Sequence, residues 1–204
     1  MLVWLLIRQL RPISPGRLLM PAVFLGSWTV LRAAHVPDPV AFVWAGVLAQ
    51  AAQIWAVLPV TVWHLNHAYG RAHHGANWCM GILLAVLTFQ IWCSDPWVSQ
   101  RLVSVYCALY AGLMALGVWG DSDVLNRYAP VSEDSDVPMH FRHHLLKLYA
   151  LFAILVIAVN EALLAINAPI STRVITLSLL PIVMHYLFTI TLLLTSPHLD
   201  ETDP

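Results

Sequence analysis

Residues 145–167 read LLKLYALFAILVIAVNEALLAIN, and only two of these side chains, Lys147 and Glu161, carry a charge. A helix that crosses the hydrocarbon core of a bilayer needs about 20 mostly apolar residues, and this run supplies them. Backbone polar groups have to bond within the segment where water is absent, so we expect such a run to be helical. This stretch therefore predicts an all-α membrane protein.

Five more segments of comparable apolar character lie on either side of this run. Together the six predicted helices cover residues 18–35, 40–64, 78–94, 98–119, 145–167 and 174–196. The sequence therefore predicts a polytopic integral membrane bundle of six transmembrane helices. We expect the whole chain, residues 1–204, to form a single transmembrane domain, with residues 120–144 as a cytoplasmic loop.

The amino-acid composition is typical of a membrane-embedded chain. Of its 204 residues, 59% are apolar and 10% are charged, whereas a soluble domain carries about 25% charged residues. The net charge of −1 leaves no basic surface for nucleic acid. The partners we expect are therefore the lipid bilayer and other membrane subunits, and no nucleic acid.

The connections between the predicted helices alternate between short and long. The short turns are His35-Val36-Pro37-Asp38, Ser94-Asp95-Pro96 and Ala168-Pro169-Ile170-Ser171. This alternation predicts three hairpins with tight outer turns.

Seven cationic residues fall on the side of the termini and long connections: Arg8, Arg11, Arg17, Arg71, Arg127, Arg142 and Lys147. Arg32, Arg101 and Arg173 fall on the other side, so the excess of positive charge predicts cytoplasmic N- and C-termini in a cell inner or plasma membrane.

Ten histidines are many for a chain of this length, and most of them gather in two groups. The first group is His64, His67, His73 and His74, and the second is His140, His143 and His144. Spacings of three and four residues put histidines on one helix face. Imidazoles that converge from two helix ends are suitable ligands for iron, copper or zinc, or axial ligands for haem. The pattern predicts a cytoplasmic metal or haem site built from His64, His67, His140, His143 and His144, with His73 or His74 in reserve.

The segment His140-Phe141-Arg142-His143-His144 resembles the H-x-x-H-H box of membrane di-iron desaturases and hydroxylases. That family has three such boxes. Here the first histidine group has a different form and a third box is absent, so the resemblance covers these five residues alone.

A second pattern consists of polar residues inside apolar segments. Gln53, Glu161 and His185 each lie within a predicted transmembrane helix. Carboxylates in a membrane are costly, and they are expected to face the bundle interior and to serve a function. These three residues predict an intramembrane polar relay for protons or a cation.

The second predicted helix carries a stripe of small and polar residues along one face. The stripe is Gly46, Ala49, Gln50, Gln53, Ala56, Val60, His64 and His67. Small residues let helices approach closely, and polar residues there bond across the interface.

Three functions are therefore open from the sequence. The first, which the histidine groups favour, is a metal- or haem-binding and redox-active membrane component. The second is a small proton or cation transporter that uses Glu161 and His185. The third is a non-catalytic subunit or assembly factor of a larger membrane complex.

Overall fold

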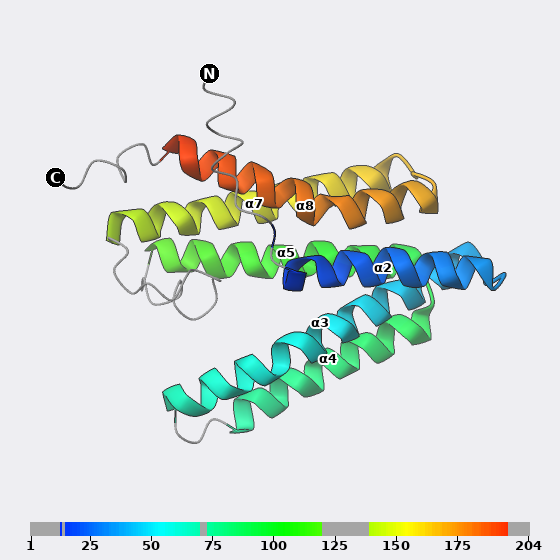
Figure 1. Ribbon diagram of the computed structural model, residues 1–204, viewed down its shortest axis with the longest axis horizontal. Coiled ribbons are helices and arrows are strands. Elements are labelled where there is room, and N and C mark those ends of the chain that lie inside the picture. Colours follow the sequence, from blue (N-terminus) through cyan, green and yellow to red (C-terminus); the bar gives the residue numbers. More distant parts are fainter. Residues whose placement is uncertain (1–12, 14, 70–72, 120–138, 196–204) are drawn as a thin grey trace. The chain divides into compact units, whose positions relative to one another are not determined.

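The computed structural model describes the backbone of residues 13, 15–69, 73–119 and 139–195. It also describes the side chains of these residues, except residues 17, 57–69, 73–79, 139–142, 193 and 195. The described chain forms six helices and contains no strand (Figure 1). They are α2 (Pro15–Ala33), α3 (Asp38–Tyr69), α4 (His73–Cys93), α5 (Pro96–Trp119), α7 (Met139–Ala165) and α8 (Ile170–Thr195). The prediction of an all-α chain with six helices is confirmed for these residues.

The helices are longer than the apolar runs that predicted them. The prediction ended the second helix at residue 64 and began the third at residue 78, whereas α3 continues to Tyr69 and α4 already begins at His73. Helix α7 likewise begins at Met139 and not at residue 145. An apolar run marks the part of a helix that fits a hydrocarbon core, but helical hydrogen bonding continues through the polar residues beyond it.

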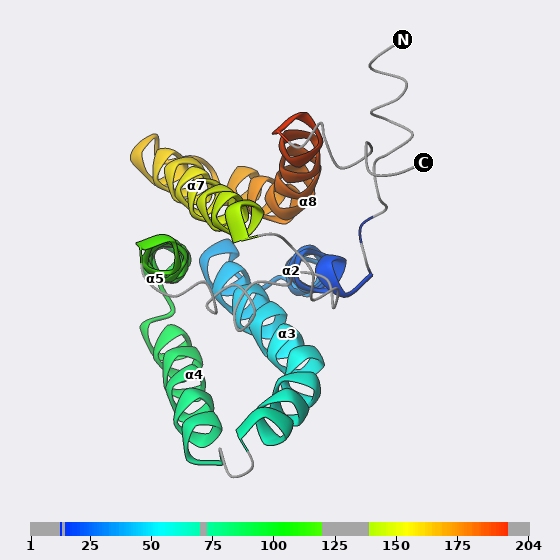
Figure 2. The same cartoon turned by 90° about the vertical axis from the view of Figure 1, so that its left-hand side faces the viewer.

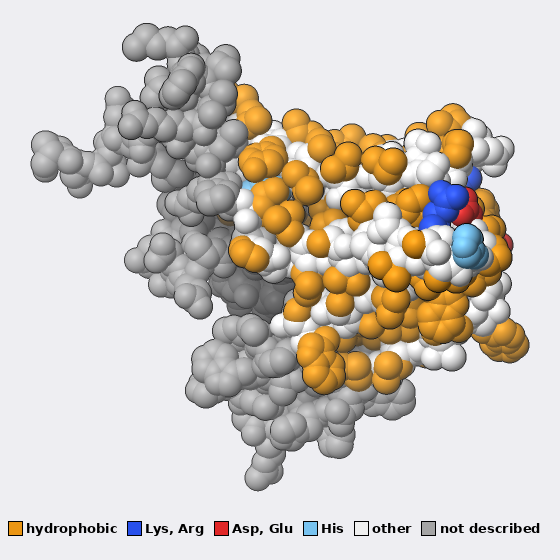
Figure 3. Space-filling view, turned by 45° about the vertical axis from the view of Figure 1, so that its right-hand side comes forward, with side chains coloured by type: hydrophobic (Ala, Val, Ile, Leu, Met, Phe, Trp, Pro, Cys, Tyr) orange, Lys and Arg blue, Asp and Glu red, His pale blue; other side chains and the backbone are white. Residues whose placement is uncertain are grey.

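Four of the described helices contain a stretch that is long and apolar enough to cross a membrane. These stretches are Asp38–Ala56, Pro96–Trp119, His143–Ala165 and Ile170–Leu192. The described apolar parts of α2 and α4, Leu18–Ala33 and Met80–Cys93, are shorter. Apolar side chains cover much of the face shown in Figure 3.

The three tight turns share one backbone feature. Each has a non-glycine residue with positive φ within two residues of the end of a helix: His35 at 60°, Ser94 at 47° and Asn167 at 49°. In each case a proline follows two residues later and helps to start the next helix. The N–H groups of His35 and Asn167 donate to the carbonyls of Arg32 (2.9 Å) and Leu164 (3.1 Å). A left-handed residue at the end of a helix helps to satisfy the last carbonyls of that helix. The Ser94 N–H donates to the carbonyl of Gln90, four residues back (3.0 Å), so the three turns share a positive φ but differ in their hydrogen bonds.

The structure falls into two compact units, which are described separately. One contains residues 100–119, 139–167 and 184–195, and the other contains residues 13, 15–69, 73–99 and 168–183. In the second unit, α2 packs on the start of α3 through a buried apolar cluster. The cluster consists of Phe24, Trp28, Ala41, Phe42, Ala45, Ala49 and Val174. Three alanines at intervals of four residues keep this face of α3 flat, so the large rings of α2 can approach it.

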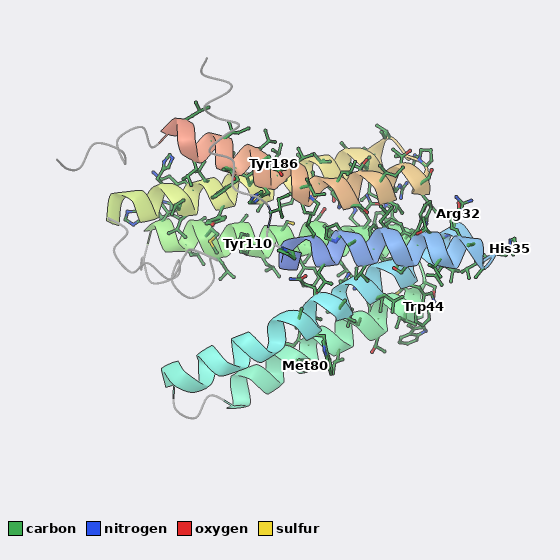
Figure 4. All side chains as sticks on the ribbon, viewed as in Figure 1. Arg32, His35, Trp44, Met80, Tyr110 and Tyr186 are labelled. Carbon is green, nitrogen blue, oxygen red and sulfur yellow. The ribbon has the colours of Figure 1, made fainter. Side chains whose placement is uncertain are left out.

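The turn at the end of this pair carries a set of polar contacts. Arg32 Nε lies 2.8 Å from Asp38 Oδ1, and its guanidinium stands 5.2 Å from the centre of the Trp28 ring. Arg32 lies in the last turn of α2 and Asp38 begins α3, so each charge also lies at the helix end that favours its sign. Figure 4 shows Arg32 and His35 at this end of α2.

In the first unit, α5, α7 and the end of α8 enclose a second cluster. Met114, Leu145 and Leu146 are buried there, with Tyr110, Val118, Tyr149, Ala150, Phe188 and Leu192 packed around them. The rings of Tyr149 and Phe188 stack with centroids 4.8 Å apart. Residues late in α5 thus meet residues early in α7, which makes the two helices antiparallel (Figure 1).

Candidate functional site

The strongest polar feature of the described chain joins α5 to α7. Arg101 Nη1 lies 2.6 Å from Glu161 Oε2, and Ser104 Oγ donates a hydrogen bond of 2.7 Å to Glu161 Oε1. The Arg101 side chain is 46% exposed and that of Glu161 is 31% exposed. Both oxygens of the carboxylate therefore have a partner on α5, and the pair as a whole carries no net charge.

Asn160 extends this cluster into the helix interface. It is fully buried, and its Nδ2 donates to the Gln100 carbonyl and to Ser104 Oγ, each over 2.8 Å. The Gln100 carbonyl fixes the orientation of the amide, because a flipped amide would place two acceptor oxygens together. Asn160 Oδ1 has no hydrogen-bond partner among the described residues. We call Gln100, Arg101, Ser104, Asn160 and Glu161 the α5–α7 polar cluster.

The α5–α7 polar cluster lies near one end of both apolar stretches. Arg101 comes five residues after Pro96, which is about 7 Å along the helix, and Glu161 comes four residues before Ala165, about 6 Å. A long arginine side chain this close to the end of an apolar stretch can place its charged group beyond the stretch. The cluster thus joins two antiparallel helices at one level through an ion pair and hydrogen bonds.

A second polar contact joins α3 to α4. Gln50 Nε2 donates to Gln90 Oε1 over 3.3 Å, and Gln90 Nε2 donates back to Gln50 Oε1 over 3.0 Å. Gln90 is fully buried. Two side-chain amides that bond reciprocally satisfy each other in an apolar surrounding, so this pair fixes the register of α3 against α4.

The three residues of the predicted relay have different surroundings. Glu161 belongs to the α5–α7 polar cluster. Half-buried His185 lies on α8, where its ring is 5.5 Å from that of Tyr186 and its carbonyl accepts a bond from Thr189. Gln53 is on α3, in the other unit, and its Oε1 has no hydrogen-bond partner among the described residues. The relay itself stays a prediction.

The predicted histidine site falls largely outside the described side chains. His64 and His67 lie in α3, His73 and His74 open α4, and His140 lies in the first turn of α7, but the side chains of all five are outside the described set. His143 and His144 are described and half-buried. Within the described part of the chain, no three histidine, cysteine, aspartate or glutamate residues are grouped to hold a metal ion. The metal or haem site stays a prediction as well.

The partner of Glu161 is not predicted from the sequence. Arg101 is counted there among the charges of the outer side, whereas the structure places Arg101 opposite Glu161. The sequence does contain one indication of this pairing. Arg101 and Ser104 are three residues apart and therefore share a helix face, and the partners of Asn160 and Glu161 have to share a face.

Comparison with known proteins adds no relative. No family model matches the chain, and neither the curated proteins nor the solved structures contain a match to it.

Proposed function

We propose that the chain is a multi-pass membrane protein that serves as a non-catalytic subunit or assembly factor of a larger membrane complex. Four helices of suitable length and hydropathy support the membrane assignment. Six transmembrane helices, cytoplasmic termini and a place in the cell membrane are part of this proposal, and the distribution of arginine and lysine supports them.

The observation that supports the structural role is that polar side chains within the apolar stretches form bonds between helices. Arg101, Ser104, Asn160 and Glu161 bond α5 to α7, and a reciprocal amide pair bonds α3 to α4. Polar groups that bond between helices hold a bundle in one arrangement. Polar side chains that bond helix to helix therefore favour a protein whose helices present a fixed surface to other subunits.

The same contacts weigh against transport through Glu161. A proton carrier needs a carboxylate that gains and loses a proton during the cycle, whereas Glu161 is held by Arg101 at 2.6 Å and by Ser104. A transport cycle would have to break this pair at each turnover. The metal-binding function predicted from the histidines is compatible with a subunit role.

Site-specific photo-crosslinking in native membranes tests the subunit role. A photoreactive residue at Leu109 or Leu116, which are 63% and 64% exposed on α5, should give a discrete crosslinked band to one other protein. The matched control is Met114 on the same helix, which is fully buried and should react within the chain alone. Crosslinks to lipid or to the chain itself from all three positions would contradict the proposal. Proton or cation flux through vesicles of the purified chain, abolished by Glu161→Gln, would replace it with the transporter.

A further inference from the structure

Helix α8 contributes to both buried apolar clusters of the described chain. Near its start, Val174 is fully buried in the apolar cluster of α2 and α3, and Leu177 packs against the same cluster. Near its end, Phe188 and Leu192 pack around Met114 in the apolar cluster of α5 and α7. The two ends of one helix are therefore held by two different cores.

A proline lies between these two points of attachment. Helix α8 runs without interruption from Ile170 to Thr195 and contains Pro181 in its interior (Figure 2). Proline has no N–H group, and its ring clashes with the carbonyl four residues earlier, so a proline inside a helix kinks or weakens it. The division of the chain into two compact units falls shortly afterwards, between residues 183 and 184. The turn that the proline weakens thus lies where α8 passes from one core to the other.

The helix has fewer hydrogen bonds around Pro181 than a regular stretch has. In a regular helix the carbonyl of Leu177 accepts a bond from the N–H of residue 181, which a proline lacks. A serine side chain beside a proline can make up for such a loss. Ser178 is buried, but its Oγ has no hydrogen-bond partner among the described residues. Bending at this turn therefore breaks fewer hydrogen bonds than bending in a regular turn.

The proline of α2 has a different setting. Pro21 also lies inside a helix, but the residues of α2 that take part in the apolar cluster with α3 begin only at Val23. A bend at Pro21 would therefore lie outside the packed part of α2. Pro181 differs because a core holds the helix on either side of it.

We propose that Pro181 makes α8 a hinge, at which the half held by the cluster of α2 and α3 and the half held by the cluster of α5 and α7 change their mutual angle. A hinge concentrates such a change in a few residues and leaves the packed groups on either side intact. The polar contacts between helices agree with this, because Gln50 and Gln90 belong to one unit and Arg101 and Glu161 to the other. The hinge does not depend on the proposed subunit role, since each of the three functions is compatible with it.

Distances between pairs of spin labels, measured by pulsed electron paramagnetic resonance, test the hinge. The full chain is labelled in lipid nanodiscs after its three cysteines are replaced by serine. The labels are attached at Val30→Cys on α2 and at Leu194→Cys on α8, whose native side chains are 68% and 58% exposed. Position 194 is 13 residues beyond Pro181, about 20 Å along the helix, so a bend of about 20° moves it by about 7 Å. We expect a distance distribution that is broadened by a movement of this size.

Replacing the proline should remove this broadening. Pro181→Ala restores the N–H that bonds to the carbonyl of Leu177, and Pro181→Leu does so with a larger side chain, so both variants should narrow the distribution. The matched control pair, Leu109→Cys on α5 with Leu194→Cys, has both labels in one unit. It should give a narrow distribution with proline, alanine or leucine at position 181, which also shows that the variants keep their fold.

Two results would overturn the proposal. One is a distribution for the Val30–Leu194 pair that is as narrow as that of the control pair while Pro181 is still present, because α8 then keeps one angle. The other is a broad distribution that neither Pro181→Ala nor Pro181→Leu narrows, because the movement then arises elsewhere in the chain.

Discussion

Two helix pairs of this protein are held together by different means. Apart from the Arg32–Asp38 ion pair at its turn, the α2–α3 pair is apolar, and it depends on Ala41 and Ala45 leaving room for the rings of Phe24 and Phe42, which meet edge to face at 5.6 Å. The α5–α7 pair has an apolar half around Met114 and a polar half around Glu161. In the membrane that we propose for this chain, apolar faces gain little from leaving their surroundings, so the first pair would rely on close packing and the second would add hydrogen bonds.

This difference has a consequence for how each pair fails. Close packing tolerates the loss of a contact but resists added volume, because the helices have to separate to make room. A polar cluster tolerates little loss, since each group that remains has lost its partner in an apolar surrounding. Opposite kinds of substitution should therefore be the damaging ones in the two pairs.

The largest effect should come from Glu161→Ala. It leaves the Arg101 charge without its carboxylate within an apolar stretch, and we expect a loss of about 2–3 kcal/mol in the free energy of unfolding, toward the low end because Arg101 is half exposed. Unfolding in mixed micelles with increasing sodium dodecyl sulfate measures it. The double variant Arg101→Leu/Glu161→Leu removes both charges and should recover most of the loss. A double variant no more stable than Glu161→Ala would mean that the loss of the ion pair with Arg101 is not the cause.

Ala45→Leu should have the next largest effect. Ala45 is fully buried between α2 and α3, so three more carbon atoms have to force the helices apart, and we expect a cost of about 2 kcal/mol. Ala85→Leu is the matched control, because Ala85 lies exposed on α4. The same unfolding assay compares the two variants. Equal stability of both would show that the α2–α3 pair has room to spare and is not held by close packing.

A smaller effect is expected for the amide pair between α3 and α4. A double-mutant cycle with Gln50→Leu and Gln90→Leu should give a coupling energy of about 0.6–1.7 kcal/mol, the range measured for bonds between helices in a membrane protein. A cycle of Gln53→Leu with Gln90→Leu provides the control. A coupling near zero for the first cycle would show that the two amides do not bond to each other in the folded protein.

Sequence reasoning recovered the elements of this fold better than their contacts. Apolar runs such as residues 145–167 predict a helix by composition alone, and the prolines near His35, Ser94 and Asn167 indicate the turns. The ends of α3 and α7 were missed because helical bonding does not stop where hydropathy falls. The pairing of Arg101 with Glu161 depends on which faces of two distant helices meet. A single sequence does not contain that information, although it does show that Glu161 needs a partner.

The smallest effect concerns the turns that the hairpins share. His35 holds a φ of 60°, a conformation in which a β-carbon is crowded and glycine is not. His35→Gly should therefore raise the free energy of unfolding by about 0.5 kcal/mol, because the relief of this crowding exceeds the extra freedom of glycine in the unfolded chain. His35→Ala is the control, since it removes the imidazole but keeps the β-carbon, and it should bring no gain. If alanine stabilised the turn as much as glycine, the imidazole and not the β-carbon would be the source of the strain. In that case, glycine at Ser94 or Asn167, which also have a positive φ, should bring no gain in stability.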